Sequence, residues 1–284
     1  MAAVNPMEIG LVVWAEKTAD ETLKYISQFG LRLIQLGVPP FIDCGVAVKD
    51  WKSALTNSPI ILTSAVCCYD GEDYSNFERV HETVGFTTAK YRPERIARTK
   101  EIADFAREFG INAISCHIGF IPADPSERLY VELIDVAREL CDTMAKNEQN
   151  FVLETGQESA AVLLQFFADV DRANLKINFD PANMILYGSG DPIQALKLLQ
   201  QHVVSVHCKD GRSPVSGSGL LGQECALGDG EVDFLGFIRQ LKQMNYIDSL
   251  TIEREELNLT KKIADIRTAI KQLERWKDII GSCP

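Results

Sequence analysis

Hydrophobic and polar positions along the chain alternate between two patterns. Short apolar runs rich in β-branched residues are typical of buried strands, and longer segments with apolar positions at the helical period are typical of amphipathic helices. The apolar runs lie at residues 9–13, 31–36, 60–67, 113–117, 150–154, 175–179, 203–207 and 249–252. The helical segments lie at residues 19–28, 49–55, 93–109, 125–146, 160–170, 192–200, 234–244 and 260–276.

Eight strand–helix units in succession predict an α/β fold, a (β/α)8 TIM barrel with a parallel eight-stranded barrel inside and helices outside. The rival is a doubly wound open sheet. Its nucleotide-binding version is disfavoured because no glycine-rich phosphate-binding sequence follows a strand. No linker or low-complexity segment separates the units, so residues 1–284 are interpreted as one barrel domain.

Two segments between these units are interpreted as loops. One is the polar stretch between the third apolar run and residue 93, and the other is the glycine- and serine-rich stretch at residues 211–230. Residues 211–219 carry an arginine and several small residues, which suit a lid or a phosphate clamp. A surface or subunit-contact loop is an equally good interpretation.

Charge, hydropathy and cysteine spacing indicate which partners, location and thiol state to expect. The formal net charge of −11 disfavours nucleic acid as a partner. No stretch is apolar and long enough to span a membrane, and the first residues lack the pattern of a signal peptide, so we predict a cytoplasmic protein. The eight cysteines are scattered without CxxC spacing and are predicted to be free thiols.

A metal-competent side chain ends each of the last four apolar runs: Glu154, Asp180, His207 and Glu253. The carboxyl ends of barrel strands meet at one mouth, so we expect these groups to converge. Three carboxylates and an imidazole suit Mn2+, Mg2+, Co2+ or Zn2+ and lack the thiolates of a structural zinc site. Because the carboxylates repel one another, we predict one divalent metal as cofactor, its identity left open.

Each of these residues taken alone has an ordinary structural explanation. Asp180 precedes Pro181 and suits a helix N-cap. Glu154 or Glu253 alone suits an ion pair, and a lone histidine on an apolar strand suits a satisfied core position. Their recurrence on four successive strands favours a site.

Five segments carry a resemblance to a known family. They are residues 153–158 (LETGQE), 178–183 (NFDPAN), 206–210 (VHCKD), 227–234 (LGDGEVDF) and 251–253 (TIE). In these segments the chain resembles the xylose-isomerase-like sugar phosphate isomerase/epimerase superfamily of TIM barrels. The N-terminal half matches in strand–helix rhythm and at residues 91–106. The resemblance implies that Glu154, Asp180, His207 and Glu253 bind the metal, and that the two glutamates are the catalytic acid–base pair.

A second group of residues is predicted to bind the substrate. Glu158 and Arg212 resemble substrate-contacting residues of the superfamily, although their spacing differs. Asn183 stands where some ketose epimerases carry a histidine, which counts against a free-ketose epimerase. His117 ends the fourth apolar run and is either a pocket residue or a buried structural histidine. Lys209 lies within one of the resembling segments and completes this group.

The predicted reaction is metal-dependent isomerisation or epimerisation of a small ketose, ketose phosphate or related hydroxy-ketone through an enediolate. Glu154 and Glu253 would act on opposite faces of the substrate, one removing the proton and the other returning it. A bound divalent metal would stabilise the enediolate charge. If one carboxylate moves the proton between neighbouring carbons, the outcome is aldose–ketose isomerisation.

Other functions remain open on the same scaffold. An inosose-type dehydratase and a non-catalytic sugar-binding barrel are the alternatives. A DNA repair phosphoesterase resembling endonuclease IV is disfavoured, because that chemistry needs a histidine-rich zinc cluster and the chain has four histidines. The predicted partner is a small sugar or sugar phosphate, with no nucleic acid and no membrane, and the resemblance implies a homo-oligomer, a dimer or tetramer.

Overall fold

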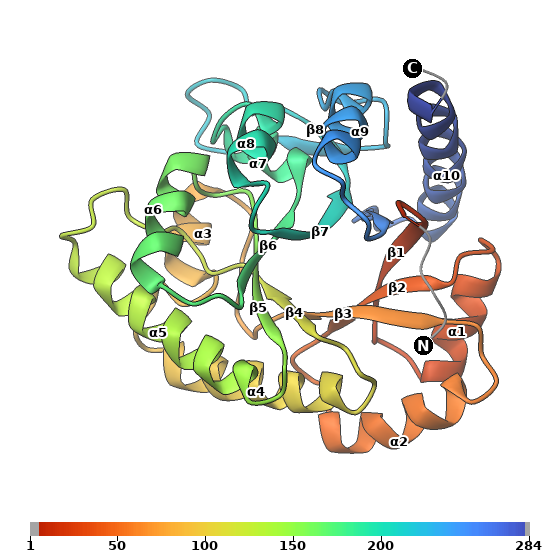
Figure 1. Cartoon of the computed structure of the whole chain (residues 1–284), viewed down its shortest axis with the longest axis horizontal. Helices are drawn as coiled ribbons and strands as arrows, with labels where there is room; N and C mark the ends of the chain where they lie inside the picture. Colours follow the sequence, from red (N-terminus) through yellow and green to blue (C-terminus); the bar gives the residue numbers. More distant parts are fainter. Residues whose placement is uncertain (1–5, 282–284) are drawn as a thin grey trace.

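The computed structural model describes residues 6–281, in which eight parallel strands close into a barrel (Figure 1). The strand order is β1-β10-β7-β6-β5-β4-β3-β2, and β1 closes the barrel by pairing with both β2 and β10. The predicted TIM barrel is therefore confirmed. The strands are β1 (Ile9–Trp14), β2 (Leu33–Val38), β3 (Ile61–Cys67), β4 (Ala113–Cys116), β5 (Asn150–Glu154), β6 (Leu175–Phe179), β7 (Val203–Cys208) and β10 (Leu250–Ile252).

One long helix follows each barrel strand, and these helices form the outer ring in Figure 1. Most begin at a side chain that caps the first turn, such as Thr18, Ser159 or Asp191. The helices are α1 (Ala19–Ser27), α2 (Cys44–Leu55), α4 (Arg92–Arg107), α5 (Arg128–Ala145), α6 (Ala160–Val170), α8 (Pro192–Leu199), α9 (Phe234–Gln243) and α10 (Leu259–Gly281).

The structure contains elements that the pattern of apolar positions did not predict. Helix α3 (Phe77–Thr83) lies in the predicted polar loop, and α7 (Pro181–Tyr187) directly follows β6. Strands β8 (Asp210–Arg212) and β9 (Gln223–Cys225) form an antiparallel pair within the predicted glycine-rich loop. Each is too short for a clear periodicity, and α7 is buried along almost its whole length, so it has no polar face.

Helix α2 begins five residues earlier than the apolar pattern predicted. Its first turn starts at Cys44, because the Asp43 side chain accepts a hydrogen bond from the Val46 amide at 3.1 Å. The first turn faces solvent in part and therefore lacks the apolar spacing that marks the rest of the helix.

The inside of the barrel carries polar side chains. Register pairs Gln35 with Ser64, Asn178 with Ser205, and Thr251 with His207. All six are buried, and hydrogen bonds connect Gln35 to Thr251 and Ser205 to Asn178. The main apolar core lies instead between the barrel and its ring of helices. These polar side chains can form hydrogen bonds with residues at the carboxyl end of the barrel, such as His207.

The structure also bears on the predictions about membrane-spanning segments and cysteines. None of the helices within residues 6–281 has both the length and the apolar character needed to cross a bilayer. The seven cysteines in this range are free, as predicted. Cys283 lies outside the described residues.

Candidate metal centre and active-site cavity

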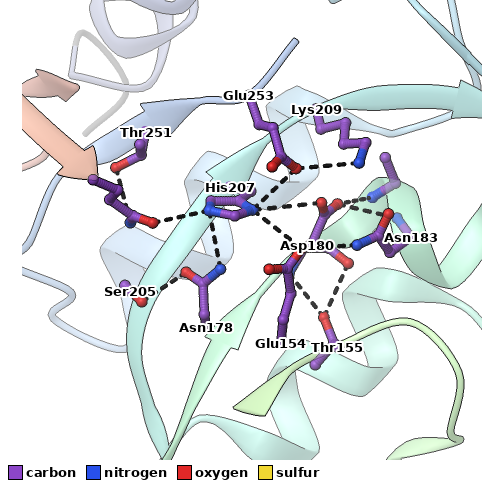
Figure 2. A network of polar contacts seen from close by, with 12 residues as sticks. Glu154, Thr155, Asn178, Asp180, Asn183, Ser205, His207, Lys209, Thr251 and Glu253 are labelled. Carbon is purple, nitrogen blue, oxygen red and sulfur yellow. Dashed lines mark hydrogen bonds and ion pairs between the residues drawn. The ribbon is translucent and has the colours of Figure 1, made fainter. Parts of the chain in front are cut away.

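Glu154, Asp180, His207 and Glu253 meet at the carboxyl end of the barrel (Figure 2). Glu154 ends β5, Asp180 follows β6, His207 lies in β7 and Glu253 follows β10. One ligand atom from each lies within 4.8 Å of the others. His207 Nδ1 is 3.3 Å from Glu154 Oε1, 3.7 Å from Asp180 Oδ2 and 3.2 Å from Glu253 Oε2. Side chains from four strands thus surround one small volume.

Two atoms of this cluster show that it fits a cation. His207 Nδ1 and Asp180 Oδ2 are buried and lack a hydrogen-bond partner within the described residues. Gln35 Oε1 lies 2.9 Å and Asn178 Nδ2 lies 3.1 Å from His207 Nε2. In the tautomer that donates from Nε2 to Gln35, Nδ1 carries a lone pair. A lone pair facing three carboxylates is unfavourable unless a positive charge lies between them. The donor set suits Mn2+, Mg2+, Co2+ or Zn2+.

Asp180 is both a helix cap and a member of the cluster. Its Oδ1 accepts hydrogen bonds from the amides of Ala182 at 2.8 Å and Asn183 at 3.0 Å, at the first turn of α7. Its Oδ2 points at the imidazole of His207. Burial raises the pKa of Asp180 above its ordinary value. The capping interaction therefore orients the carboxylate so that the second oxygen is available as a ligand.

A cavity of about 870 Å3 opens above the cluster, and only the two glutamates of the cluster line it. Asp180 and His207 lie beneath them with no exposed surface. Within the described residues, the hydrogen bonds and ion pairs of the two glutamates involve Glu154 Oε1 and Glu253 Oε2. The other oxygens, Glu154 Oε2 and Glu253 Oε1, are not fully buried. Each glutamate therefore has one oxygen directed at the cluster and one available to a molecule in the cavity.

Neighbouring basic side chains favour ionisation of both glutamates. Burial works against ionisation of Glu253, but Lys209 and His207 outweigh it and hold its pKa well below the ordinary value. Burial likewise opposes ionisation of Glu154, whose pKa is lowered by His117 and His207. With no cation at the cluster, burial lowers the pKa of His207, but Glu253 and Glu154 raise it well above the ordinary value, and a metal bound at Nδ1 would take the place of that proton. Two ionised carboxylates at the cavity floor are suited to accept protons.

Four of the five predicted substrate-binding residues line the cavity: His117, Asn183, Lys209 and Arg212. The Asn183 amide donates to Glu154 Oε1 at 2.9 Å, and His117 Nε2 lies 3.6 Å from the same oxygen. Lys209 is buried and donates to Glu253 Oε2 at 3.1 Å. These contacts hold the two glutamate side chains in place. The sequence predicted these residues as substrate-binding residues and did not indicate that they contact the glutamates.

Glu158 and Arg212 are placed differently from the rest. Glu158 is absent from the cavity lining and is buried behind it, where its carboxylate accepts a hydrogen bond from the Ile121 amide at 2.9 Å. Burial raises the pKa of Glu158 to about 8. The Arg212 side chain is exposed and donates to the Asp229 carbonyl oxygen at 2.9 Å.

Several cavity residues were not predicted. Trp14 at the end of β1, Tyr74 before α3 and Tyr187 at the end of α7 contribute aromatic surface. Trp14 could have been found from its place at the end of the first apolar run. Tyr74 and Tyr187 carry no such signal, because they belong to α3 and α7 and to the segments beside them. Glu255, two residues after Glu253, contacts Lys209 at 2.7 Å.

Comparison with known proteins assigns the family. Residues 11–276 match the family model described as a xylose isomerase-like TIM barrel. The chain belongs to this family. The resemblance seen in the sequence motifs is thereby confirmed.

The similar proteins include one solved structure with sequence identity above 30%. A xylose isomerase domain protein from Planctomyces limnophilus is 36% identical, with a TM-score of 0.92, covering 98% of this chain and 100% of that one. An uncharacterized protein from Methanocaldococcus jannaschii is 24% identical over 197 residues, which cover 64% of this chain and 60% of the archaeal protein.

More distant structures share the fold. A D-tagatose 3-epimerase-like protein is 15% identical with a TM-score of 0.74, covering 97% of this chain and 98% of that chain. A probable 3-DHS dehydratase from Bacillus anthracis is 16% identical with a TM-score of 0.65, covering 93% of this chain and 98% of that chain. At these identities the likeness shows the fold alone.

Proposed function

We propose that this protein is a divalent-metal-dependent isomerase or epimerase that acts on a ketose or a related hydroxy-ketone. One observation carries the proposal: two ionised glutamates line the cavity, and each also contributes an oxygen to the buried cluster with Asp180 and His207. Acid–base groups and a cation site that share side chains suit proton transfer next to a carbonyl.

Each residue of the site has a defined part in this scheme. Glu154 removes the proton from the carbon beside the carbonyl, held in place by Asn183 and by the nearby His117. Glu253 passes to the opposite face a proton that it takes from Lys209, whose Nζ lies 3.1 Å away. Glu154 then gives its proton to solvent and Lys209 regains one from solvent, which restores two ionised glutamates. A divalent cation held by Glu154, Asp180, His207 and Glu253 would supply Lewis-acid stabilisation of negative charge on the substrate oxygens, an effect worth several kcal/mol.

Proton return from the opposite face inverts the carbon, and return to the neighbouring carbon isomerises the sugar. Paired carboxylates on two different strands favour epimerisation, because each can serve one face of a substrate lying between them. Trp14, Tyr74 and Tyr187 restrict water around the reacting carbon.

Solvent exchange tests the proposal. Metal-loaded protein is incubated in D2O with a ketose panel, and we expect deuterium at the carbon next to the carbonyl. Glu154→Gln and Glu253→Gln should each lower the exchange rate by at least about 100-fold, the lower range for general acid–base catalysis. Glu274→Gln, a control on the exposed face of α10, should leave it unchanged.

The products distinguish the outcomes. Normal exchange in both cavity variants would contradict the two-carboxylate scheme. An ultraviolet-absorbing unsaturated ketone in place of an epimer would identify a dehydratase instead. Tight metal binding without exchange on any member of the panel would identify a sugar-binding barrel.

A further inference from the structure

A second cavity lies at the amino-terminal end of the barrel, opposite the metal cluster. Its volume is about 360 Å3. Its lining includes Asn150, the first residue of the strand that Glu154 ends, and Val203, the first residue of β7. Residues 244–248, which lead into β10, close one side of it. We call this cavity the amino-terminal pocket, and no residue that lines the catalytic cavity lines it.

One buried polar group of the pocket has no partner. Ser64 lines the pocket with 2% of its surface exposed, and its Oγ has no hydrogen-bond partner within residues 6–281. A buried hydroxyl without a partner is unfavourable, and folded proteins contain few of them. A polar ligand in the pocket would supply the missing hydrogen bond.

Carboxamide side chains supply many of the other polar groups in the lining. Within the described residues, the side chains of Asn112 and Asn150 form no hydrogen bond. A carboxamide both donates and accepts hydrogen bonds, as does a hydroxyl group, so such a lining suits a molecule with several hydroxyls. The carboxamides that line the pocket are Gln35, Asn112, Asn150, Gln200 and Asn245.

The pocket carries little charge. Among the described residues that line it, Asp248 is the only carboxylate, and none is a lysine, arginine or histidine. Asp248 Oδ1 already accepts a hydrogen bond from the Ser249 amide at 2.7 Å. An anion would meet no cation in this lining, and a cation would meet one carboxylate that is already engaged. The lining therefore favours a neutral ligand.

The volume indicates the size of the ligand. At roughly 30 Å3 per water molecule, about 360 Å3 corresponds to on the order of twelve waters, which is about the number of non-hydrogen atoms in a hexitol. Cavities that bind small molecules begin at about 300 Å3.

We propose that the amino-terminal pocket is a second binding site, for a neutral molecule with several hydroxyl groups and about the size of a hexitol. Hydroxyls of this ligand pair with Ser64 Oγ and with the carboxamides of Asn112 and Asn150. The site does not depend on the reaction proposed above, because its residues are separate from those of the catalytic cavity.

Two residues of the pocket also support the metal centre. Gln35 Oε1 lies 2.9 Å from His207 Nε2. Ser205 donates to Asn178 at 2.6 Å, and Asn178 lies 3.1 Å from the same nitrogen of His207 (Figure 2). A ligand that contacts Gln35 or Ser205 therefore acts on the imidazole through the side chains that orient it. Occupancy of the pocket should alter the affinity of the cluster for a divalent cation, and the reverse holds by reciprocity.

A pair of matched variants tests where the ligand binds. The probes are sorbitol and methyl glucoside, which have no carbonyl group and do not react, and calorimetry measures their binding to the metal-free protein. Asn150→Leu should weaken binding at least about tenfold, because it removes a hydrogen-bonding group of the site. Asn183→Leu, the same change in the catalytic cavity, should leave binding unchanged. The opposite result, or no binding to the natural chain, would overturn the proposal.

Ser64→Ala distinguishes a ligand-binding hydroxyl from one that serves the fold. Removing an unpartnered buried hydroxyl should raise the melting temperature of the free protein. The same variant should bind sorbitol at least about fivefold more weakly. A lower melting temperature with unchanged sorbitol binding would contradict the role given to Ser64.

Two charged analogues of sorbitol test the ligand class. Glucamine replaces one hydroxyl with an ammonium group, and gluconate replaces one end with a carboxylate. We expect both to bind more weakly than sorbitol, and tighter binding of either would overturn the assignment of a neutral ligand.

Titration with Mn2+ tests the link to the metal centre. Saturating sorbitol should alter the Mn2+ affinity of the natural chain at least about fivefold, the lower end of typical coupling between sites. The effect should vanish in Asn150→Leu. Equal Mn2+ affinity with and without sorbitol in the natural chain would overturn the link, and an effect that persists in Asn150→Leu would place the polyol outside the amino-terminal pocket.

Discussion

Gln35 lies in β2 inside the barrel, yet it determines how His207 faces the cluster. Its Oε1 is 2.9 Å from His207 Nε2, and its amide nitrogen is 3.3 Å from Thr251 Oγ1. Asn178 also lies 3.1 Å from Nε2. A partner behind a ligating imidazole selects the tautomer and the ring orientation, so Gln35 is a positioning residue for the candidate metal centre.

Replacing Gln35 should therefore weaken metal binding. Gln35→Leu removes the acceptor behind His207, and we expect the affinity for Mn2+ to fall about 10–100-fold. Calorimetric titration of the metal-free protein measures this directly. Gln149→Leu is the matched control, because Gln149 is equally buried but donates to the Ala103 and Ile111 carbonyls elsewhere. Equal metal affinity in the two variants would contradict the assigned role.

Glu158 makes folding stability depend on pH. Burial raises its pKa to about 8 from an ordinary value of 4.5. Between these values the folded state retains a proton that the unfolded state releases, so the free energy of unfolding contributed by this group falls as pH rises. The contribution is fully present below about pH 4.5 and is lost as pH passes through about 8.

The variant Glu158→Gln should remove that dependence. It keeps an oxygen for the Ile121 amide and carries no charge. We expect it to be more stable than the natural chain at pH 8 by a few kcal/mol, at about 1.4 kcal/mol per pKa unit, and close to it at pH 4.5. Thermal unfolding across this range measures the difference. Glu127→Gln, at an exposed glutamate, should show no such trend.

At the scale of elements, the β8–β9 pair differs most from what the pattern of apolar positions predicted, because that segment was interpreted as a loop. The strands are three residues each and pair with one another, and the Asp210 side chain accepts hydrogen bonds from Gly211 in β8 and from three amides after β9. Gly230 leaves no room for a side chain, because an added Cβ would lie 2.1 Å from Asp210 Oδ1. One buried carboxylate thus joins the start of this segment, at Gly211, to its end at residues 228–232.

Loss of that carboxylate should destabilise the segment. Asp210→Ala leaves four amides without their acceptor, and we expect a loss of about 3 kcal/mol, since hydrogen bonds to charged groups are each worth about 1.5–3 kcal/mol and are not additive. Asp233→Ala removes the N-cap of α9 and should lose only about 1 kcal/mol. Denaturant unfolding measures both, and equal losses would contradict the role given to Asp210.

Helices α3 and α7 show why some elements escape prediction. Helix α7 has buried residues along almost its whole length, so it lacks the alternation between apolar and polar faces that marks α5 or α9. Helix α3 is seven residues long and starts at the Asn76 side chain. Both follow strand ends, where the chain must turn over the mouth, and their conformation depends on what packs beneath them.

For the whole molecule, the proposed metal site predicts that folding stability increases when a divalent cation is added. A cation that binds only the folded state at 100 times its dissociation constant adds about 2.7 kcal/mol. For a chain of this size we expect Mn2+ to raise the melting temperature by about 5–10 °C, and a chelator to reverse it.

Asp180→Asn should abolish the rise, because it removes a ligand charge while keeping an oxygen for the α7 cap. Asp191→Asn, the same change at the N-cap of α8, should retain it. A metal-dependent rise that persists in Asp180→Asn would place the metal elsewhere.

The predictions of a cytoplasmic location and of a dimer or tetramer concern the molecule in its surroundings. They stay predictions, because the structure describes one chain. Size-exclusion chromatography with light scattering measures the oligomeric state directly.

Order along the chain was enough to predict the eightfold barrel and the convergence of Glu154, Asp180, His207 and Glu253. Apolar periodicity reports how each element is buried, and parallel strands bring their carboxyl ends together whatever their exact register. The contacts that govern the chemistry needed the folded chain. Gln35 meets His207 across 172 positions, and Lys209 meets Glu253 across 44. Such partners are selected by strand register and barrel curvature, which no local pattern of residues encodes.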